Sequence, residues 1–242
     1  MKQFVPDYQY SYFSGAIIFL TAWLILFLWQ RRYHAEMLSG TLLSTPFAFT
    51  AFLFIPQYWT PPSLWNLDAR YGIGVEDFLW SAAVGGIASV ASEIFFRGQL
   101  VRSRVAQPDP RWAPLIVVVV VLAVLVSLFR NHVMYDTIAA LLVGAATVAV
   151  LRPDLIGRMT RGALIFAVIY GLLFAYFLLL YPEFVTRFYN IKNLLGFYVL
   201  GIPIEELLFA YSGGLMWCVI YEYMQHYRAK SNPSGPAAVA AS

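Results

Sequence analysis

The sequence predicts an all-α integral membrane protein, a bundle of about seven spanning helices in which one three-helix unit occurs twice. Composition is the first of three observations behind this fold class. Hydrophobic residues make up 60% of the 242 residues and charged residues only 12%, and the mean hydropathy is +0.67. Such a chain has too little polar surface to cover a soluble globule. The other two observations are a series of apolar segments and an internal repeat.

Seven apolar segments each approach the ~20 residues that a spanning helix needs. They cover residues 12–30, 41–58, 72–96, 112–129, 134–151, 162–181 and 196–221. The polar connections between them are too short to form a core of their own. We therefore expect one transmembrane bundle over residues 1–227 and a disordered cytoplasmic tail over residues 228–242.

Basic residues predict how the bundle is oriented in the cell membrane, which we expect to be the cytoplasmic membrane. In a seven-span arrangement, eleven of the 16 Lys and Arg residues fall on the side of the C-terminus. The positive-inside rule then places the C-terminus in the cytoplasm and the N-terminus outside. The net charge of +3 then needs no nucleic-acid or acidic-substrate partner to explain it, because the basic side faces the cytoplasm and anionic lipid. We expect membrane lipid as a partner and no nucleic acid, and a homo-oligomer remains possible.

An internal repeat appears when the sequence is shifted by 129 residues. The stretch GIGVEDFLW at residues 72–80 then aligns with GIPIEELLF at residues 201–209, and Glu93 aligns with Glu222. Because the matching segments lie four spans apart, both copies point the same way through the membrane. The expected layout is a first copy over about residues 10–97, a linking span over about residues 112–129 and a second copy over about residues 134–226.

Two pairs of adjacent acids define the candidate site. A carboxylate in the hydrocarbon core costs about 2.5–3.5 kcal/mol on insertion scales, so Glu205 and Glu206 indicate a functional site, and Glu76 and Asp77 hold the matching positions of the first copy. We expect all four carboxyl groups to converge in one cavity. Pro203 is predicted to kink the helix beside them. The predicted cavity residues are Pro203, Trp80, Phe209, Tyr211 and Trp217. The rings of the four aromatic residues could stabilise a cation.

The remaining polar residues point to structural roles. Glu93 precedes Arg97 by four residues, and Glu222 precedes His226 by four, so we expect two interfacial ion pairs at the cytoplasmic ends of their helices. His132 and Asp136 supply only two ligands, whereas a catalytic zinc usually takes three protein ligands. We therefore predict no metal site and no cofactor.

The second copy also resembles a known family. Pro203-Ile204-Glu205-Glu206, followed by Tyr221-Glu222, is similar to the Pro-x-Glu-Glu signature of the carotenoid (lycopene) cyclase domain family of small integral-membrane type. Members use two related three-span domains, so the resemblance implies two fused copies in this chain. The first copy departs from the signature, with Gly74 in place of the proline and Asp77 in place of the second glutamate.

The resemblance implies an intramolecular lyase or isomerase of carotenoid biosynthesis. Members of the family cyclise the ends of a linear carotenoid without net redox change, by acid and base catalysis on a substrate that enters from the lipid. Glu205, Glu206, Glu76 and Asp77 are then the acid and base candidates, and the sequence leaves open which is which.

Two other functions remain open on the sequence. A proton- or lipid-handling transporter or scaffold would also use intramembrane acids and a repeat. An intramembrane protease of the prenyl-protein type is indicated by Glu93 with Arg97 and by His132 with Asp136, although Ser92 replaces the first glutamate of that motif. The absence of a lysine from residues 193–223 argues against a retinal-binding photoreceptor, whose Schiff base needs one in the last span.

Overall fold

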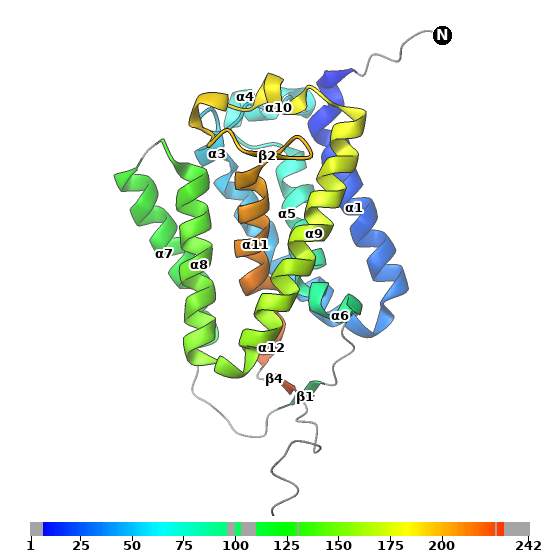
Figure 1. Cartoon of the computed structure of the whole chain (residues 1–242), viewed down its shortest axis with the longest axis vertical. Helices are drawn as coiled ribbons and strands as arrows, with labels where there is room; N and C mark the ends of the chain where they lie inside the picture. The colour runs from blue at the N-terminus through cyan, green and yellow to red at the C-terminus, as the bar shows by residue number, and fades with distance from the viewer. Residues whose placement is uncertain (1–6, 96–99, 103–109, 130, 226, 230–242) are drawn as a thin grey trace, which may run out of the picture.

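The computed structural model describes residues 7–95, 100–102, 110–129, 131–225 and 227–229, and most of them are helical (Figure 1). The predicted all-α class is therefore confirmed in its main feature. Two short antiparallel strand pairs add to the helices. They are β1 (Leu100–Arg102) with β4 (Tyr227–Ala229), and β2 (Tyr198–Val199) with β3 (Ile202–Pro203). Arg97, His226 and the tail from residue 230 lie outside the described residues.

Four helical stretches within the described residues are long and apolar enough to cross a membrane, which fits a membrane protein. They are Tyr8–Trp29, Arg31–Phe54, Val133–Leu151 and Pro153–Leu180. These stretches contain α1 (Ser11–Trp29), α2 (His34–Ser44), α3 (Ala51–Phe54), α8 (Val133–Leu151) and α9 (Ile156–Leu180). A shorter apolar helix, α7 (Ala113–Leu128), occupies the predicted linking segment. The predicted count of seven spans is not confirmed.

The two segments that carry the acid pairs are broken helices. The first of these segments contains α5 (Val75–Ser89) and α6 (Ala91–Phe95), separated at Val90. Residues 196–221 contain α11 (Ile204–Trp217), which ends before Cys218, and α12 (Ile220–Gln225) follows. Pro203 is the N-cap of α11, so the predicted proline kink is corrected. Proline is tolerated at a helix start because the first N–H groups have no partner within the helix.

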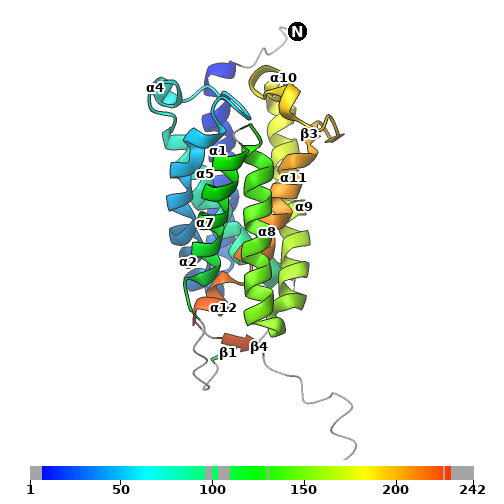
Figure 2. The ribbon, with the colours of Figure 1, turned by 90° about the vertical axis from the view of Figure 1, so that its left-hand side faces the viewer.

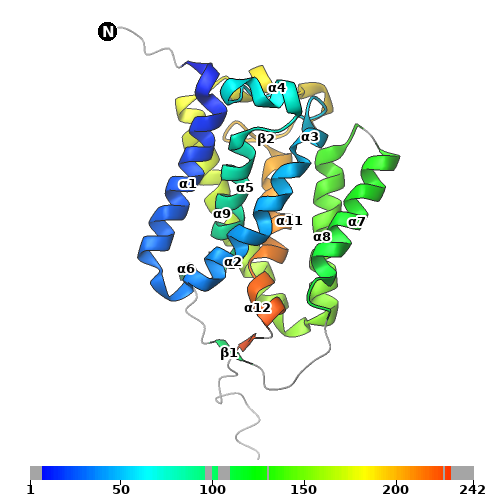
Figure 3. The ribbon, with the colours of Figure 1, turned by 180° about the vertical axis from the view of Figure 1, so that it is seen from behind.

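Each broken helix lies between two of the long helices (Figures 1 and 3). Helix α5 packs against α1 and α2, and α11 packs against α8 and α9. The two central helices also contact each other, and α7 packs on the outside of α8. The acid pairs at the starts of α5 and α11 are thereby held inside the bundle.

The connecting segments gather at the two ends of the bundle (Figure 2). Helices α4 (Leu67–Tyr71) and α10 (Phe184–Phe188) lie at one end with β2 and β3, whereas α6, α12, β1 and β4 lie at the other. At the first end, Asn190 donates its N–H to the carbonyl of Tyr58 and Thr60 donates to the carbonyl of Phe188, each over 2.8 Å. The segment after α3 is thus joined to the segment after α10.

Two glycines allow the central helices to approach their neighbours closely. A Cβ atom at Gly85 of α5 would lie 2.0 Å from Oγ of Ser44 on α2. A Cβ atom at Gly214 of α11 would lie 2.8 Å from Cα of Ala163 on α9. Both distances are shorter than real Cβ contacts, so the helices pack at these spacings only because no side chain intervenes.

We expect Gly85→Val and Gly214→Val each to destabilise the protein by about 1–3 kcal/mol, because the added side chain forces packed helices apart. Thermal unfolding in detergent should show a melting temperature lower by about 2–10 °C. The control is Gly157→Ala on α9, where the nearest atom to the new Cβ is the end of the Arg161 side chain, 4.0 Å away. Unchanged melting of both valine variants would contradict this packing.

Candidate functional site

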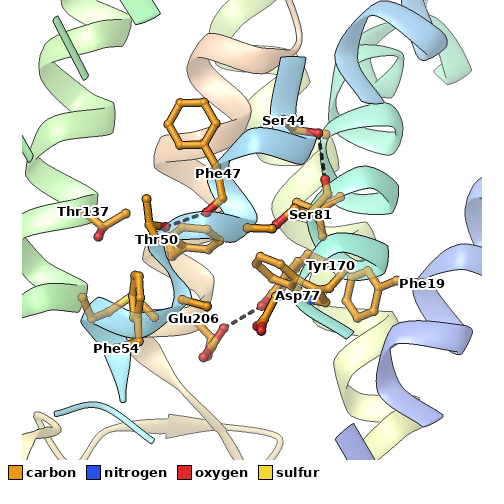
Figure 4. A pocket seen from close by; sticks show the side chains of 18 of the residues that line it. Phe19, Ser44, Phe47, Thr50, Phe54, Asp77, Ser81, Thr137, Tyr170 and Glu206 are labelled. Carbon is orange, nitrogen blue, oxygen red and sulfur yellow. Dashed lines mark hydrogen bonds between the residues drawn. The ribbon is translucent and has the colours of Figure 1, made fainter. Parts of the chain in front are cut away.

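An apolar cavity of about 180 Å³ lies inside the bundle, lined by residues of α1, α2, α5, α8, α9 and α11 among others. Two carboxyl groups line it, those of Asp77 and Glu206. Figure 4 shows Asp77 reaching the cavity from α5 and Glu206 reaching it from α11, among aromatic side chains. Each of the two matching helices therefore supplies one acid to a common space.

Glu206 is held by three phenol groups. Tyr58 and Tyr189 donate to its Oε1 over 3.0 and 2.9 Å, and Tyr170 donates to its Oε2 over 2.6 Å. The three tyrosines come from the segment after α3, the segment after α10 and helix α9, and all four side chains are buried. Hydrogen bonds donated to a carboxylate stabilise its ionised form. These donors offset part of the cost of placing a charge in an apolar interior.

Asp77 has a smaller set of donors. Tyr12 of α1 donates to Oδ1 over 2.5 Å, and the backbone N–H of Gly74 donates to Oδ2 over 2.7 Å. The second bond is part of the cap of α5, because Gly74 is the N-cap residue and Asp77 lies three positions later. Asp77 is therefore fixed both by its own helix start and by α1.

Glu76 and Glu205 are directed away from the cavity. Glu76 Oε1 accepts the backbone N–H of Leu64 over 2.7 Å, and Glu205 Oε1 accepts that of Leu195 over 2.6 Å. Glu205 also accepts the hydroxyl of Tyr135 over 2.7 Å. Adjacent residues diverge by about 100° around a helix, so only one acid of each pair can face the cavity. The prediction that all four carboxyl groups converge in one cavity is therefore corrected: two of them line the cavity.

The aromatic lining agrees with part of the prediction. Trp80, Phe209 and Trp217 line the cavity, and the rings of Trp80 and Phe209 stack with centroids 5.8 Å apart. Pro203 and Tyr211 are not among the lining residues, which corrects their assignment. Helical periodicity gives the reason for Tyr211. Residues 209, 213 and 217 follow Glu206 on one face of α11, whereas residue 211 lies on another face.

The four tyrosines that hold the cavity acids were missed by sequence reasoning. Tyr12, Tyr58, Tyr170 and Tyr189 belong to 16 tyrosines in the chain, and most of these suit bilayer anchoring or packing equally well. Their spacing from the acids reaches 148 residues, so no local pattern connects them. Only the packing of separate helices and loops identifies them.

Glu93 and Glu222 are buried at the other end of the bundle. Both make ion pairs with the guanidinium of Arg158 on α9. The predicted partners Arg97 and His226 lie outside the described residues. Helix α8, which follows His132, begins at the opposite end from α6, which carries Glu93 (Figure 1). The motif halves of the protease hypothesis are thus not brought together.

Asp68 on α4 is a further buried acid beside the first pair. Neither of its carboxylate oxygens has a hydrogen-bond donor among the described residues. A Cβ atom at Gly74 would lie 2.4 Å from its Oδ1 and 2.6 Å from Oε2 of Glu76, so the two carboxyl groups are close. Burial, followed by the negative charges of Asp77 and Glu76, raises the pKa of Asp68 to about 7.

The raised pKa of Asp68 predicts a pH-dependent stability. Below about pH 4 this group is protonated in both folded and unfolded chains. As the pH rises to about 7, only the unfolded chain releases the proton, so stability falls by up to about 1.4 kcal/mol per pH unit. Melting temperatures measured from pH 4 to pH 8 should fall less steeply for Asp68→Asn than for the wild type. Parallel curves for the two proteins would show that ionisation of Asp68 does not lower the stability of the protein.

Comparison with known proteins links the second half of the chain to one family. A protein-family model described as lycopene cyclase matches residues 131–224. This stretch contains α8, α9 and α11, with Glu205 and Glu206, and it supports the resemblance to the carotenoid cyclase family. A search of curated proteins and a search of solved structures each gave no match.

Proposed function

We propose that this chain is a lycopene cyclase-like membrane enzyme that closes a ring at the end of a linear carotenoid or a similar isoprenoid. The observation that carries the proposal is the apolar cavity that presents two carboxyl groups, Asp77 and Glu206, from two matching helices. The lycopene cyclase match over residues 131–224 supports the same conclusion. An apolar substrate would reach such a cavity from the lipid.

The reaction is an isomerisation that consumes and returns one proton. A carboxylic acid protonates the terminal double bond of the substrate and leaves a carbocation. An internal double bond attacks this cation, so that the ring carbon–carbon bond forms and the positive charge moves to a ring carbon. A carboxylate then removes a proton from a neighbouring carbon and restores a double bond. No electrons are exchanged with another molecule, so the reaction itself requires no redox cofactor.

The hydrogen bonds favour one distribution of roles. Glu206 receives three phenol donors, which stabilise its ionised form, so we assign it as the base and as the counter-charge to the carbocation. Asp77 receives one phenol donor and one backbone donor, and we assign it as the acid. Trp80, Tyr170 and Phe209 line the same cavity, where aromatic rings would stabilise a cation. The apolar walls also keep water from trapping the cation.

The proposal includes two fused, parallel three-helix copies, over about residues 10–97 and 134–226. Four features support it: a central helix between two long helices in each half, breaks at Val90 and before Val219, close-approach glycines at 85 and 214, and loop-anchoring glutamates at 76 and 205. With α7 and the two broken helices included, the chain would cross the cytoplasmic membrane seven times. The basic residues then place the C-terminus in the cytoplasm.

Expression in cells that accumulate lycopene tests the proposed activity directly. We expect cyclic carotenoid from the wild type, and a loss of about 100-fold or more for Asp77→Asn and Glu206→Gln, since each removes a proton-transfer group. The control is Glu183→Gln, which changes an exposed glutamate paired with Arg187 and should keep full activity. Linear carotenoid from the wild type would contradict the cyclase. Proton or lipid movement by the purified protein in liposomes would then favour a transporter.

The outward-facing acids should respond differently from the cavity acids. Glu76→Gln and Glu205→Gln keep a carbonyl oxygen that can accept the loop N–H groups of Leu64 and Leu195. We therefore expect these variants to keep at least about a tenth of the wild-type conversion, well above Asp77→Asn and Glu206→Gln. Pigment analysis at equal protein levels makes the comparison. Complete loss in Glu205→Gln with full activity in Glu206→Gln would reverse the assignment of the cavity acid.

A further inference from the structure

Three buried glutamates meet at the end of the bundle opposite the acid pairs. Glu36 of α2, Glu93 of α6 and Glu222 of α12 each bring a carboxylate oxygen within 4.8 Å of the others. Their exposed fractions are 7%, 3% and 0%. Helix α12 packs on α2, and α6 packs on α9, so the group joins elements from both halves of the chain.

One buried cation already contacts this cluster. Arg158 of α9 makes ion pairs through Nη2 with Oε1 of Glu93 and Oε1 of Glu222. The remaining oxygen of Glu93 accepts the hydroxyl of Ser92 over 2.5 Å. Arg158 supplies one positive charge against three carboxyl groups, which leaves an excess of negative charge whenever more than one of them is ionised. Such an excess is costly unless a further positive charge is bound.

Two carboxylate oxygens in the cluster have no donor. Oε2 of Glu36 and Oε2 of Glu222 are buried and accept no hydrogen bond from any described residue. A buried acceptor without a hydrogen-bond donor destabilises the protein by the full free energy of its desolvation. Arg158 therefore pairs with only some of the carboxylate oxygens. The two Oε2 atoms of Glu36 and Glu222 can still bind a ligand.

We propose that Glu36, Glu93 and Glu222 bind one divalent cation of the hard, oxygen-preferring class. Metal–oxygen distances of about 2.1–2.5 Å place opposite ligand oxygens roughly 4–5 Å apart, which matches the spacing of the cluster. The charge of +2 neutralises the excess. Cys218 offers no soft ligand, because its thiol is directed to the carbonyls of Arg158 and Met159, at 3.7 and 3.6 Å. The donors are all oxygen, as Mg²⁺, Mn²⁺ and Ca²⁺ prefer.

The cation would act as a structural link and not in the chemistry of the cavity. Glu93 follows Asp77 by 16 residues, and Glu222 follows Glu206 by 16 residues, which corresponds to about 24 Å along a helix. The site would join α2 to the ends of the two broken helices, close to the breaks after Ser89 and Trp217. It is therefore independent of the proposed cyclase activity.

Metal-dependent stability of the purified protein tests the site. The protein is treated with a chelator, desalted, and melted alone or with Mg²⁺, Mn²⁺ or Ca²⁺. We expect one of these ions to raise the melting temperature by about 5–10 °C at 100 times its Kd. Elemental analysis after gel filtration should find about one equivalent of that ion per chain. Glu36→Gln should lose both effects, and the exposed-site control Glu183→Gln should keep both.

Glu36→Gln is chosen because it should fold. Without metal, the wild-type carboxylate of Glu36 has an oxygen with no donor, so removing its charge should leave the metal-free melting temperature unchanged or higher. Loss of the metal effect would then report loss of a ligand and not loss of structure. No shift and no bound metal with any of the three ions would overturn the proposal. An equal shift in Glu36→Gln and the wild type would overturn it as well.

Discussion

A carboxylate inside an apolar helix bundle persists only with hydrogen-bond donors or positive charge around it, and this constraint shapes both ends of the protein. At one end, phenol and backbone donors hold the acids at the starts of α5 and α11. At the other end, Arg158 holds two acids that follow the breaks in the same polypeptide segments. Each of the two segments therefore carries buried acids near both of its ends, and at each end other residues stabilise them. The bundle must bring distant elements together to supply the donors.

Two adjacent acids at a helix start point in different directions and contact different parts of the protein. The divergence of adjacent side chains sends Asp77 and Glu206 into the cavity and sends Glu76 and Glu205 to the preceding loops. All four lie in the first turns of their helices, where the helix dipole favours negative charge. The outward acid accepts a backbone N–H of the preceding loop and so fixes that loop to the start of the helix. In the proposed function, loss of the outward acid would therefore affect the loop, and loss of the cavity acid would affect the reaction.

The sequence predicted those features that depend on local pattern. Helix positions followed from apolar segments, and the acids were found because carboxylates are rare in such segments. The tyrosines around Glu206 and the meeting of Glu36 with Glu222 could not be found, because they depend on contacts between helices far apart in the chain. Helical periodicity distinguishes Tyr211 from the cavity-facing residues of α11. The sequence predicts a kink at Pro203 because the start of α11 lies within a longer apolar run.

The first copy differs from the Pro-x-Glu-Glu signature at two positions, and these two differences depend on each other. Proline has no N–H, whereas Gly74 donates its N–H to Asp77 over 2.7 Å. The absence of a Cβ at Gly74 also admits the carboxyl groups of Asp68 and Glu76 at distances that a side chain would prevent. In the second copy, Pro203 offers no such donor, and Glu206 depends on three phenols instead. The two helix starts thus surround their cavity acids with different donors, and this inequality favours the proposed division into one acid and one base.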